Sequence, residues 1–373
     1  MAYLRKTLQA DIVGFGTLKG MPLILNDDYS VHLVSQYYFL FLLKRVVVGS
    51  VYTYAGHIAD FISQLEVDGK TISDIDDNWL RAYKKALIHR DGNDSNTNNY
   101  ASQVMRTVIN YCYWLTENGY ERALCGVDKL NKIQIELTRT GSIRHILNKN
   151  TNTDKRPVFP PKTEWINLVK VYGPQREDLQ VRFELMMDWG SAAGLRADEA
   201  CHLKKKQLPS LKAAEKALDD ETDLIVELTH TKGNKRAKIK VNPVLVIKTW
   251  NYIELYRDVV VEKFRKEAKV LRKTFKESSY IFLSSTTGVA ITTRGFSNSV
   301  RTAFLAAVND GELNEQQRVW LHGLRHNFIN VTLKMHDSNN QKNSEELTIR
   351  QSRHGSVDAM QPYTGARYDE NFS

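Results

Sequence analysis

A helical stretch near the C-terminal end of the chain places the strongest constraint on its fold. Apolar residues recur there at alternating steps of three and four, which is the spacing of one buried helix face. These residues are Leu321, Leu324, Phe328, Val331 and Met335. The sequence therefore predicts a helix that packs this face against a core.

Polar side chains flank the predicted face. His322 and Arg325 lie three residues apart, so both can project over the same edge of the helix. A histidine can share a proton near neutral pH, and an arginine is a permanent cation with a forked donor array. The pair suits an oxyanion, above all a phosphate. The His-x-x-x-His spacing of His322 and His326 also occurs in zinc sites, but Gly323 stands where a metalloprotease carries its glutamate.

Four other segments strengthen the phosphate interpretation. Together with the helical stretch they supply, in chain order, Arg, Lys, His-x-x-Arg, His and Tyr. The four are Gly194-Leu195-Arg196-Ala197-Asp198-Glu199, Thr231-Lys232-Gly233-Asn234-Lys235, Arg353-His354-Gly355-Ser356 and Pro362-Tyr363-Thr364-Gly365.

This order of residues resembles the tyrosine recombinase (phage integrase) family, and the resemblance covers about half of the chain. The surroundings also match, with Gly-Leu-Arg-x-x-Glu around Arg196 and a tyrosine nine residues after His354. The resemblance implies a mainly α fold with a small antiparallel β-hairpin. An N-terminal helical core-binding bundle would precede an α+β catalytic domain. One departure is Ser352-Arg353, which replaces the Leu-Gly that usually precedes the second histidine.

Cleavage of a phosphodiester needs cations that take up charge on the phosphate. The resemblance gives this work to Arg196 and Arg325, which would clamp the non-bridging oxygens as forked donors. His322 would donate a further hydrogen bond or handle the proton of the nucleophile. His354 would support the same phosphate.

The reaction also needs a nucleophile and a proton for the departing oxygen. The resemblance assigns these roles to Tyr363, which would form a 3′-phosphotyrosine, and to Lys232. Tyr368 is a rival nucleophile outside the family spacing, and Lys235 is a second, supporting lysine on the same turn. Glu199 either buttresses Arg196 or only complements the dipole of a helix first turn. Because phosphotyrosine conserves the bond energy, the resemblance implies no metal, ATP or other cofactor.

Charge and composition agree with a polyanionic partner. Lys and Arg number 52 against 43 Asp and Glu, a net charge of +9. The cysteines Cys112, Cys125 and Cys201 form no CxxC pair and lie in apolar or helical surroundings, which indicates reduced core thiols. No signal peptide and no apolar run of the ~18 residues that a membrane span needs are recognised. The sequence predicts a soluble, cytoplasmic, nucleoid-associated protein.

Hydrophobic periodicity and a polar, proline-containing stretch divide the chain into parts. Residues 1–30 show no firm periodicity and form an arm or extra segment, and 31–137 carry four helical patterns, typical of a core-binding bundle. A polar and proline-containing stretch predicts a linker over 138–162, with the catalytic domain at 163–373. Predicted helices cover 34–43, 51–65, 79–88, 99–115, 259–276 and 296–308, and predicted strands cover 224–228 and 237–241.

The leading interpretation is a site-specific recombinase that acts as a homotetramer on double-stranded DNA, as in integration or excision of mobile DNA, with accessory proteins left open. Two alternatives remain. One is relaxation of DNA by a type IB topoisomerase-like monomer, and the other is a DNA-binding protein of the same fold that lacks the reaction.

Overall fold

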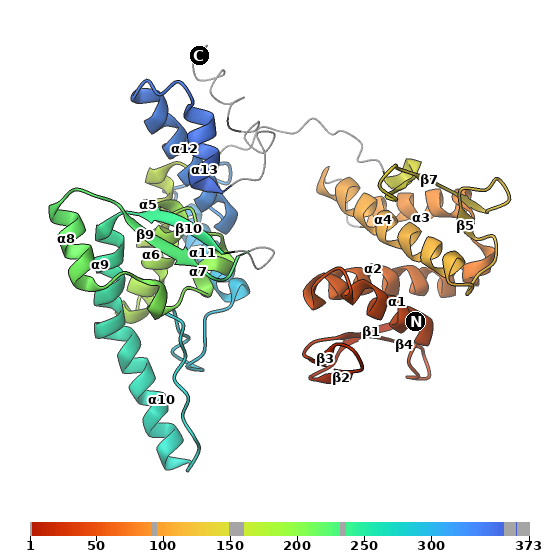
Figure 1. The fold of residues 1–373 in the computed structure, drawn as a ribbon, viewed down its shortest axis with the longest axis horizontal. Helices are drawn as coiled ribbons and strands as arrows, with labels where there is room; N and C mark the ends of the chain where they lie inside the picture. Colours follow the sequence, from red (N-terminus) through yellow and green to blue (C-terminus); the bar gives the residue numbers. More distant parts are fainter. Residues whose placement is uncertain (1, 91–94, 149–159, 232–235, 354–362, 364–373) are drawn as a thin grey trace. The chain divides into compact units, whose positions relative to one another are not determined.

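The computed structural model describes residues 2–90, 95–148, 160–231, 236–353 and 363 of the 373. The chain forms two compact units, Met1–Arg156 and Pro157–Ser373, each with a core of its own. The fold is mostly helical with small sheets, as predicted (Figure 1). No helix in the described ranges is long and apolar enough to cross a membrane.

The first unit is built around the four predicted helices. Residues at helical spacing on the second helix, including Val51, Ile58 and Phe61, are fully buried, which confirms the sequence pattern there. The fourth helix ends before Gly119, whose φ of 74° is the left-handed value expected of a C-terminal glycine. The four helices are α1 (Leu33–Leu43), α2 (Val48–Val67), α3 (Asp77–Arg90) and α4 (Ser95–Glu117).

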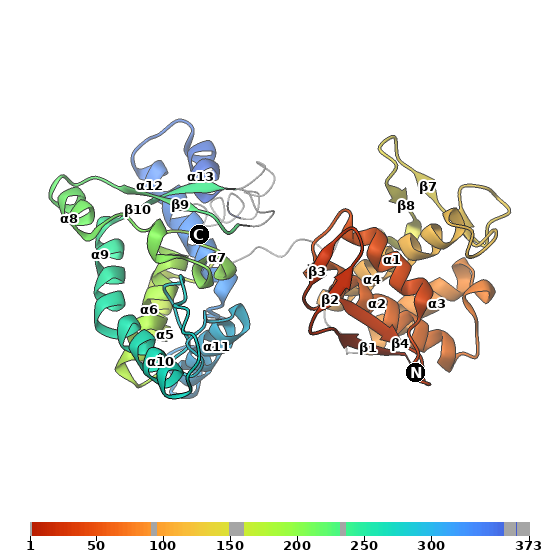
Figure 2. The same cartoon turned by 60° about the horizontal axis from the view of Figure 1, so that its bottom comes forward.

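The first thirty residues form two short antiparallel pairs, which periodicity did not indicate (Figure 2). Strands of three or four residues are too short to show a convincing alternation. Met21 and Ile24 are buried in the core of the first unit, so this segment packs against the helices. The pairs are β1 (Tyr3–Lys6) with β4 (Pro22–Leu25), and β2 (Ala10–Ile12) with β3 (Gly16–Leu18).

Short elements that follow α4 also belong to the first unit. Lys84 donates to the Leu147 carbonyl oxygen at 2.8 Å, and His145 pairs with Asp77 at 2.8 Å. The part of the predicted linker up to residue 148 therefore packs on the helices. The elements are the parallel pair β5 (Cys125–Gly126) and β6 (Ile133–Gln134), the antiparallel pair β7 (Glu136–Leu137) and β8 (Ile143–Arg144), and the 3₁₀ turn η2 (Ile146–Asn148).

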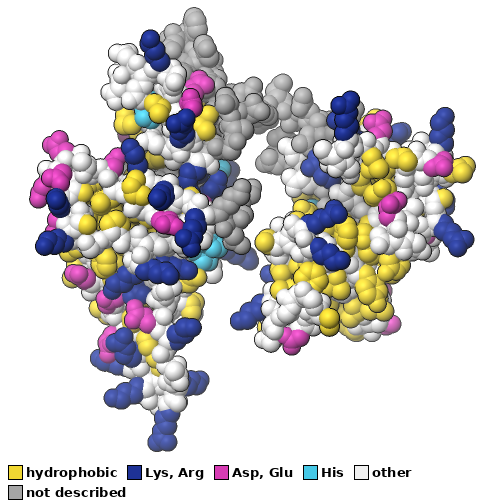
Figure 3. All heavy atoms as spheres, viewed as in Figure 1, with side chains coloured by type: hydrophobic (Ala, Val, Ile, Leu, Met, Phe, Trp, Pro, Cys, Tyr) yellow, Lys and Arg dark blue, Asp and Glu magenta, His cyan; other side chains and the backbone are white. Residues whose placement is uncertain are grey.

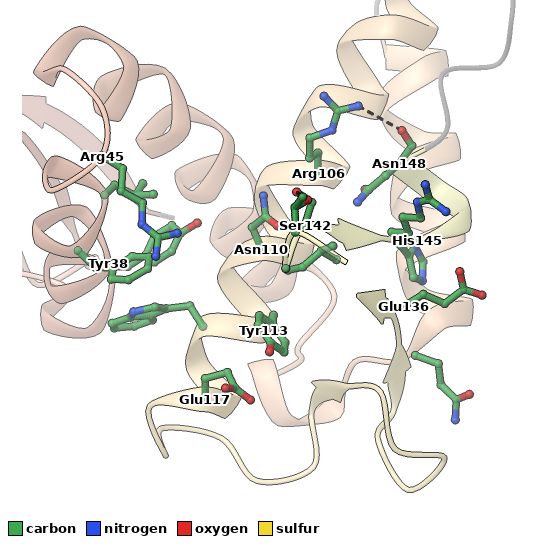
Figure 4. Close-up of a pocket in the computed structure, with 18 of the residues that line it drawn as sticks. Tyr38, Arg45, Arg106, Asn110, Tyr113, Glu117, Glu136, Ser142, His145 and Asn148 are labelled. Carbon is green, nitrogen blue, oxygen red and sulfur yellow. Dashed lines mark hydrogen bonds between the residues drawn. The ribbon is translucent and has the colours of Figure 1, made fainter. Parts of the chain in front are cut away.

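A groove of about 1280 Å³ lies between these short elements and helices α1 and α4. Figure 4 shows Tyr38 and Arg45 at one side of it and Arg106, His145 and Asn148 at the other. Its charges are mixed, which does not favour a phosphate channel. The charged residues in the lining, apart from His145, are Arg45, Arg106, Arg144, Asp77, Glu117 and Glu136.

The second unit places one antiparallel hairpin among helices. The two strands have the predicted bounds, and their register pairs Ile239 with Val226, both buried. Its elements are α5 (Thr163–Val171), α6 (Glu177–Ser191), α7 (Ala197–Cys201), η3 (Lys205–Gln207), α8 (Leu211–Asp219), β9 (Leu224–Leu228), β10 (Ala237–Val241), α9 (Pro243–Tyr252), η4 (Ile253–Arg257), α10 (Asp258–Val270), α11 (Thr293–Asn309), α12 (Leu321–Ser338) and α13 (Ser344–Ser352).

Helix α10 is shorter than the sequence predicts, because it ends at Val270 and not at Lys276. Arg272 has a φ of 52°, and Lys273 donates its backbone N–H to the Ala268 carbonyl oxygen, which together close the helix. Helices α9 and α10 and the π-turn between them form one extended rod in Figure 1, and Figure 3 shows Lys and Arg side chains along it.

The buried face predicted for α12 is partly wrong. Val331 and Met335 are 49% and 47% exposed, although Leu324 is buried. The buried positions include polar residues that an apolar count overlooks. Asn327 donates to the Pro161 carbonyl oxygen at 2.9 Å, and such a buried partner satisfies the amide. The residues buried along α12 are Gly323, Leu324, Arg325, Asn327, Ile329, Thr332, Leu333 and His336.

Helices α6 and α12 pack closely because two glycines lie between them. A Cβ at Gly190 would stand 3.0 Å from Leu324, and one at Gly194 would stand 2.5 Å from Phe328. The missing side chains thus let α12 approach the end of α6. That approach determines the geometry of the candidate site.

Candidate active site

The first candidate residue lies at a corner between α6 and α7. Gly194 has a φ of 65°, and the Leu195 backbone N–H donates to the Trp189 carbonyl oxygen at 3.0 Å. Leu195 folds back and is buried, as predicted for a helix that ends on a glycine. Arg196 is then the N-cap residue of α7, with its side chain about one third exposed.

The carboxylate of Glu199 joins two arginines. Its oxygens accept from the Arg196 backbone N–H and guanidinium, both at 2.9 Å. They also accept two bonds from Arg353, at 2.8 and 3.2 Å. The Glu199 side chain is 2% exposed, so these are bonds of a buried ion cluster. Glu199 thus contacts the Arg196 side chain and also caps the first turn of α7 through the Arg196 backbone N–H.

The pKa of Glu199 reflects a competition. Burial alone would raise it, but hydrogen bonds and charge from Arg353, with smaller contributions from Arg196, outweigh burial and lower the pKa. Because the folded pKa is lowered, the carboxylate contributes stability above its unfolded pKa of about 4.3. That stability is lost as the pH falls through the folded value.

We expect Glu199→Gln to destabilise the second unit by about 3 kcal/mol near pH 7, because the largely buried Arg353 and the partly exposed Arg196 lose their counter-charge. Urea unfolding across a pH series measures the effect, and the deficit should shrink as the wild-type carboxylate becomes protonated. Glu227→Gln is the matched control, since its pair with Arg236 is exposed and worth about 0–1 kcal/mol. Equal unfolding midpoints for the two variants near neutral pH would contradict this account.

Arg325 is the most deeply buried cation of the site, at 1% exposure. Its guanidinium donates to the carbonyl oxygens of Gly194 and Ser352, which ties α12 to the ends of α6 and α13. Burial, followed by the charges of Arg196 and Arg353, lowers the pKa of Arg325 to about 9, so it remains a cation at pH 7. Its Nε is buried and has no acceptor among the described residues, so one donor of the guanidinium is unsatisfied in this state.

His322 lies in the first turn of α12 and is exposed. Desolvation by its neighbours, then the charges of Arg325 and Arg196, lower its pKa. The imidazole is therefore mainly neutral at pH 7, with one nitrogen to donate and one to accept. Arg325 and Arg196, the other two predicted phosphate ligands, thus act electrostatically on His322.

Tyr363 is buried, at 3% exposure, and packs with Ile329 and Leu333. Its hydroxyl forms a hydrogen bond with Nδ1 of His326. Burial raises the pKa of the phenol, although the charge of Arg325 opposes the shift. The tyrosine is therefore protonated at neutral pH in this state.

Four residues named from the sequence lie outside the described residues. They are Lys232, Lys235, His354 and the rival nucleophile Tyr368. The remaining five lie around the contact between α6 and α12, together with two residues that the sequence prediction missed. Those two are Arg353, which pairs with Glu199, and His326, which contacts Tyr363. His326 could have been found, because it belongs to the same His-x-Leu-Arg-His motif.

This arrangement has parts for phosphoryl transfer. Arg196 and Arg325 supply two permanent cations, and His322 supplies a neutral imidazole beside them. Tyr363 supplies an oxygen that is within the electrostatic reach of Arg325. Cations placed where charge develops, next to a nucleophile, are what a phosphodiester needs in order to be cleaved.

No family sequence model matches the chain, and no curated protein matches it in sequence. Solved structures do match it. A lambda integrase (75–356) dimer bound to a COC′ core site is 12% identical, with a TM-score of 0.54 over 89% of this chain and 94% of that one. The XerH site-specific recombinase in a post-cleavage complex with palindromic difH is 15% identical, with a TM-score of 0.53 over 94% of this chain and 91% of that one.

The Tn1549 transposon integrase (82–397) in complex with circular intermediate DNA is also similar. It is 16% identical, with a TM-score of 0.52 over 90% of this chain and 98% of that one. All three are tyrosine recombinases. At this level of identity the likeness establishes architecture, and the architecture agrees with the motifs: the chain has the tyrosine recombinase fold.

Proposed function

We propose that this protein is a site-specific DNA recombinase that breaks and rejoins DNA strands through a covalent 3′-phosphotyrosine at Tyr363. The observation that carries the proposal is that Arg325 donates to the Gly194 carbonyl oxygen, two residues before Arg196, while its charge acts on both His322 and Tyr363. These residues come from segments up to 167 positions apart, since 363 − 196 = 167. Their types match two of the needs of phosphodiester cleavage, cations for the phosphate charge and a nucleophile. The third need, a proton for the departing oxygen, is assigned to Lys232 below.

Arg196 and Arg325 have different work in this proposal. Arg196 is partly exposed and already oriented by Glu199, so its guanidinium can bind a non-bridging oxygen without rearrangement of the corner. Arg325 is buried and holds the backbone of two helix ends. Its charge then acts on the same phosphate, while His354, by resemblance, would support the remaining oxygen.

In the chemical step, the Tyr363 oxygen forms a bond to phosphorus while the bond from phosphorus to the 5′ oxygen breaks. The phenol must lose its proton. We assign the acceptor role to His322, because its lowered pKa leaves the imidazole unprotonated at pH 7. His326 holds the hydroxyl in the absence of DNA and would release it. The departing oxygen needs a proton, which we assign to Lys232. A second strand's hydroxyl then reverses the reaction, with no metal or ATP.

The partner in this proposal is double-stranded DNA with a defined target site, bound by the first unit and the catalytic unit of a homotetramer. The predicted division into arm, core-binding domain, linker and catalytic domain stays a proposal, as does the nucleoid-associated location.

The decisive experiment incubates the protein with a nicked suicide substrate and looks for a denaturation-resistant adduct. A DNA-binding protein without activity gives none, and relaxation of any plasmid by a monomer would favour the topoisomerase alternative.

Affinity for target DNA should fall steeply with salt. Phosphate contacts release counterions, so the binding constant falls by roughly 0.9 log units per neutralised phosphate for each tenfold rise in salt. For six to ten contacts, the loss between about 50 and 200 mM salt is roughly 10³- to 10⁵-fold. An anisotropy titration measures the slope, and a nearly flat response would remove DNA from the account.

A further inference from the structure

A cluster of one carboxylate and two imidazoles lies two residues beyond Arg196. It consists of Asp198 on α7, His202 at the end of that helix, and His230 just after β9. One ligand atom from each of the three lies within 4.8 Å of the other two. We propose that these three side chains form a binding site for a divalent transition-metal ion, with Zn²⁺ as the best fit.

The imidazole nitrogens of the two histidines lie close to the Asp198 carboxylate. Nε2 of His230 lies 2.6 Å from one Asp198 oxygen, and Nδ1 of His202 lies 3.2 Å from the other. The two rings stack with centroids 4.1 Å apart and planes 28° apart, so their edges lie side by side. Ligand atoms around tetrahedral zinc stand roughly 3.3 Å apart, given metal–nitrogen distances of about 2.0–2.1 Å. Only small side-chain movements separate this cluster from that geometry.

The donor set also determines which ion fits. Imidazole ligands suit zinc, copper and nickel, whereas magnesium and calcium prefer oxygen ligands. Three protein ligands leave a tetrahedral ion one position for water. The three side chains are between about one third and a little over half exposed, so an ion and its water can reach them.

Neighbouring groups orient the ligands as they do in known metal sites. The Thr293 hydroxyl donates to an Asp198 oxygen at 3.3 Å, and Nδ1 of His202 lies 2.8 Å from the Asp198 backbone oxygen. Binding of the ion through Nδ1 of His202 would replace this backbone hydrogen bond, and binding through Nε2 would keep it with the proton on Nδ1. Tyr280 packs edge-on against the His202 ring, at 5.4 Å between centroids, and limits its rotation.

A bound ion would link two parts of the chain that meet near the candidate active site. Asp198 is the neighbour of Glu199, which orients Arg196, and His230 follows strand β9 of the hairpin. The metal would therefore hold α7 and the end of this strand together. It takes no part in the proposed strand cleavage, and the inference does not depend on that function.

The test measures Zn²⁺ binding to the chelator-treated full-length chain by titration calorimetry, without DNA. We expect one saturable site, weakened at least about tenfold in Asp198→Asn, His202→Gln and His230→Gln, because even loss of a group that merely supports a ligand costs about that much. His89→Gln, an exposed histidine on α3, is the matched control and should bind normally. His322→Gln should also bind normally, which excludes the His322–His326 pair as the binding site.

A second measurement covers variants that fold poorly. Zn²⁺ should raise the unfolding temperature of wild type and of His89→Gln, and should leave that of the cluster variants unchanged. Absence of a saturable site in wild type means that the cluster is only a hydrogen-bond network and overturns the proposal. Unchanged affinity in all three cluster variants overturns it as well, since the ion then binds elsewhere. Because neither measurement uses DNA, both outcomes are independent of the strand-cleavage assay.

Discussion

Tyr363→Phe should form no detectable covalent adduct with a nicked suicide substrate and should still bind target DNA. The substitution removes only the oxygen that attacks phosphorus. The ring that packs with Ile329 and Leu333 remains, so the fold around it should be preserved. Denaturing gel electrophoresis of the reaction measures the adduct, and an anisotropy titration measures DNA binding.

Tyr368→Phe is the matched control, because it removes the rival hydroxyl five residues further along the chain. It should form the adduct at nearly the wild-type rate. Peptide mapping of the trapped wild-type adduct identifies the residue directly. DNA found on Tyr368 or on a serine would show that the nucleophile is assigned wrongly.

Features encoded by local rules could be predicted from the sequence. The stop at Gly194, the inward turn of Leu195 and the position of Arg196 before a new helix all follow from the left-handed preference of glycine. The strands Leu224–Leu228 and Ala237–Val241 follow from a short apolar run and an alternating run on either side of a turn signal. Each of these depends on a few neighbouring residues, which a single sequence contains.

Features that depend on distant partners could not be predicted in this way. Arg353 stands where the family usually has glycine, and it adopts a φ of 58°, which is unfavourable for a side chain with a Cβ. Its ion pair is with Glu199, 154 residues away, which no local pattern indicates. The apolar count on α12 failed for the same reason, because Arg325 and Asn327 are buried through bonds to remote carbonyl groups.

Lys232→Ala should be severely impaired on ordinary DNA and should be restored by a substrate with sulfur at the bridging 5′ position. An alkoxide is a poor leaving group and needs a proton from an acid. A thiol with a pKa of about 8.5 leaves readily as a thiolate and needs none. Cleavage rates on the oxygen and sulfur substrates measure the rescue. Lys232 lies outside the described residues, so this prediction depends on its place in the sequence.

Arg196→Ala tests whether sulfur rescue is specific for a missing proton donor, because this variant lacks charge stabilisation instead. Arg196 acts on the non-bridging oxygens, so its loss should cost ~2.7–4 kcal/mol, at least a hundredfold in rate, on both substrates. Lys235→Ala is the neighbouring control and should lose little on either substrate. If sulfur rescues Lys235→Ala and not Lys232→Ala, the acid is the second lysine of the turn. If sulfur rescues Arg196→Ala as fully as Lys232→Ala, sulfur compensates for charge stabilisation as well as for the proton, and the rescue no longer identifies Lys232 as the acid.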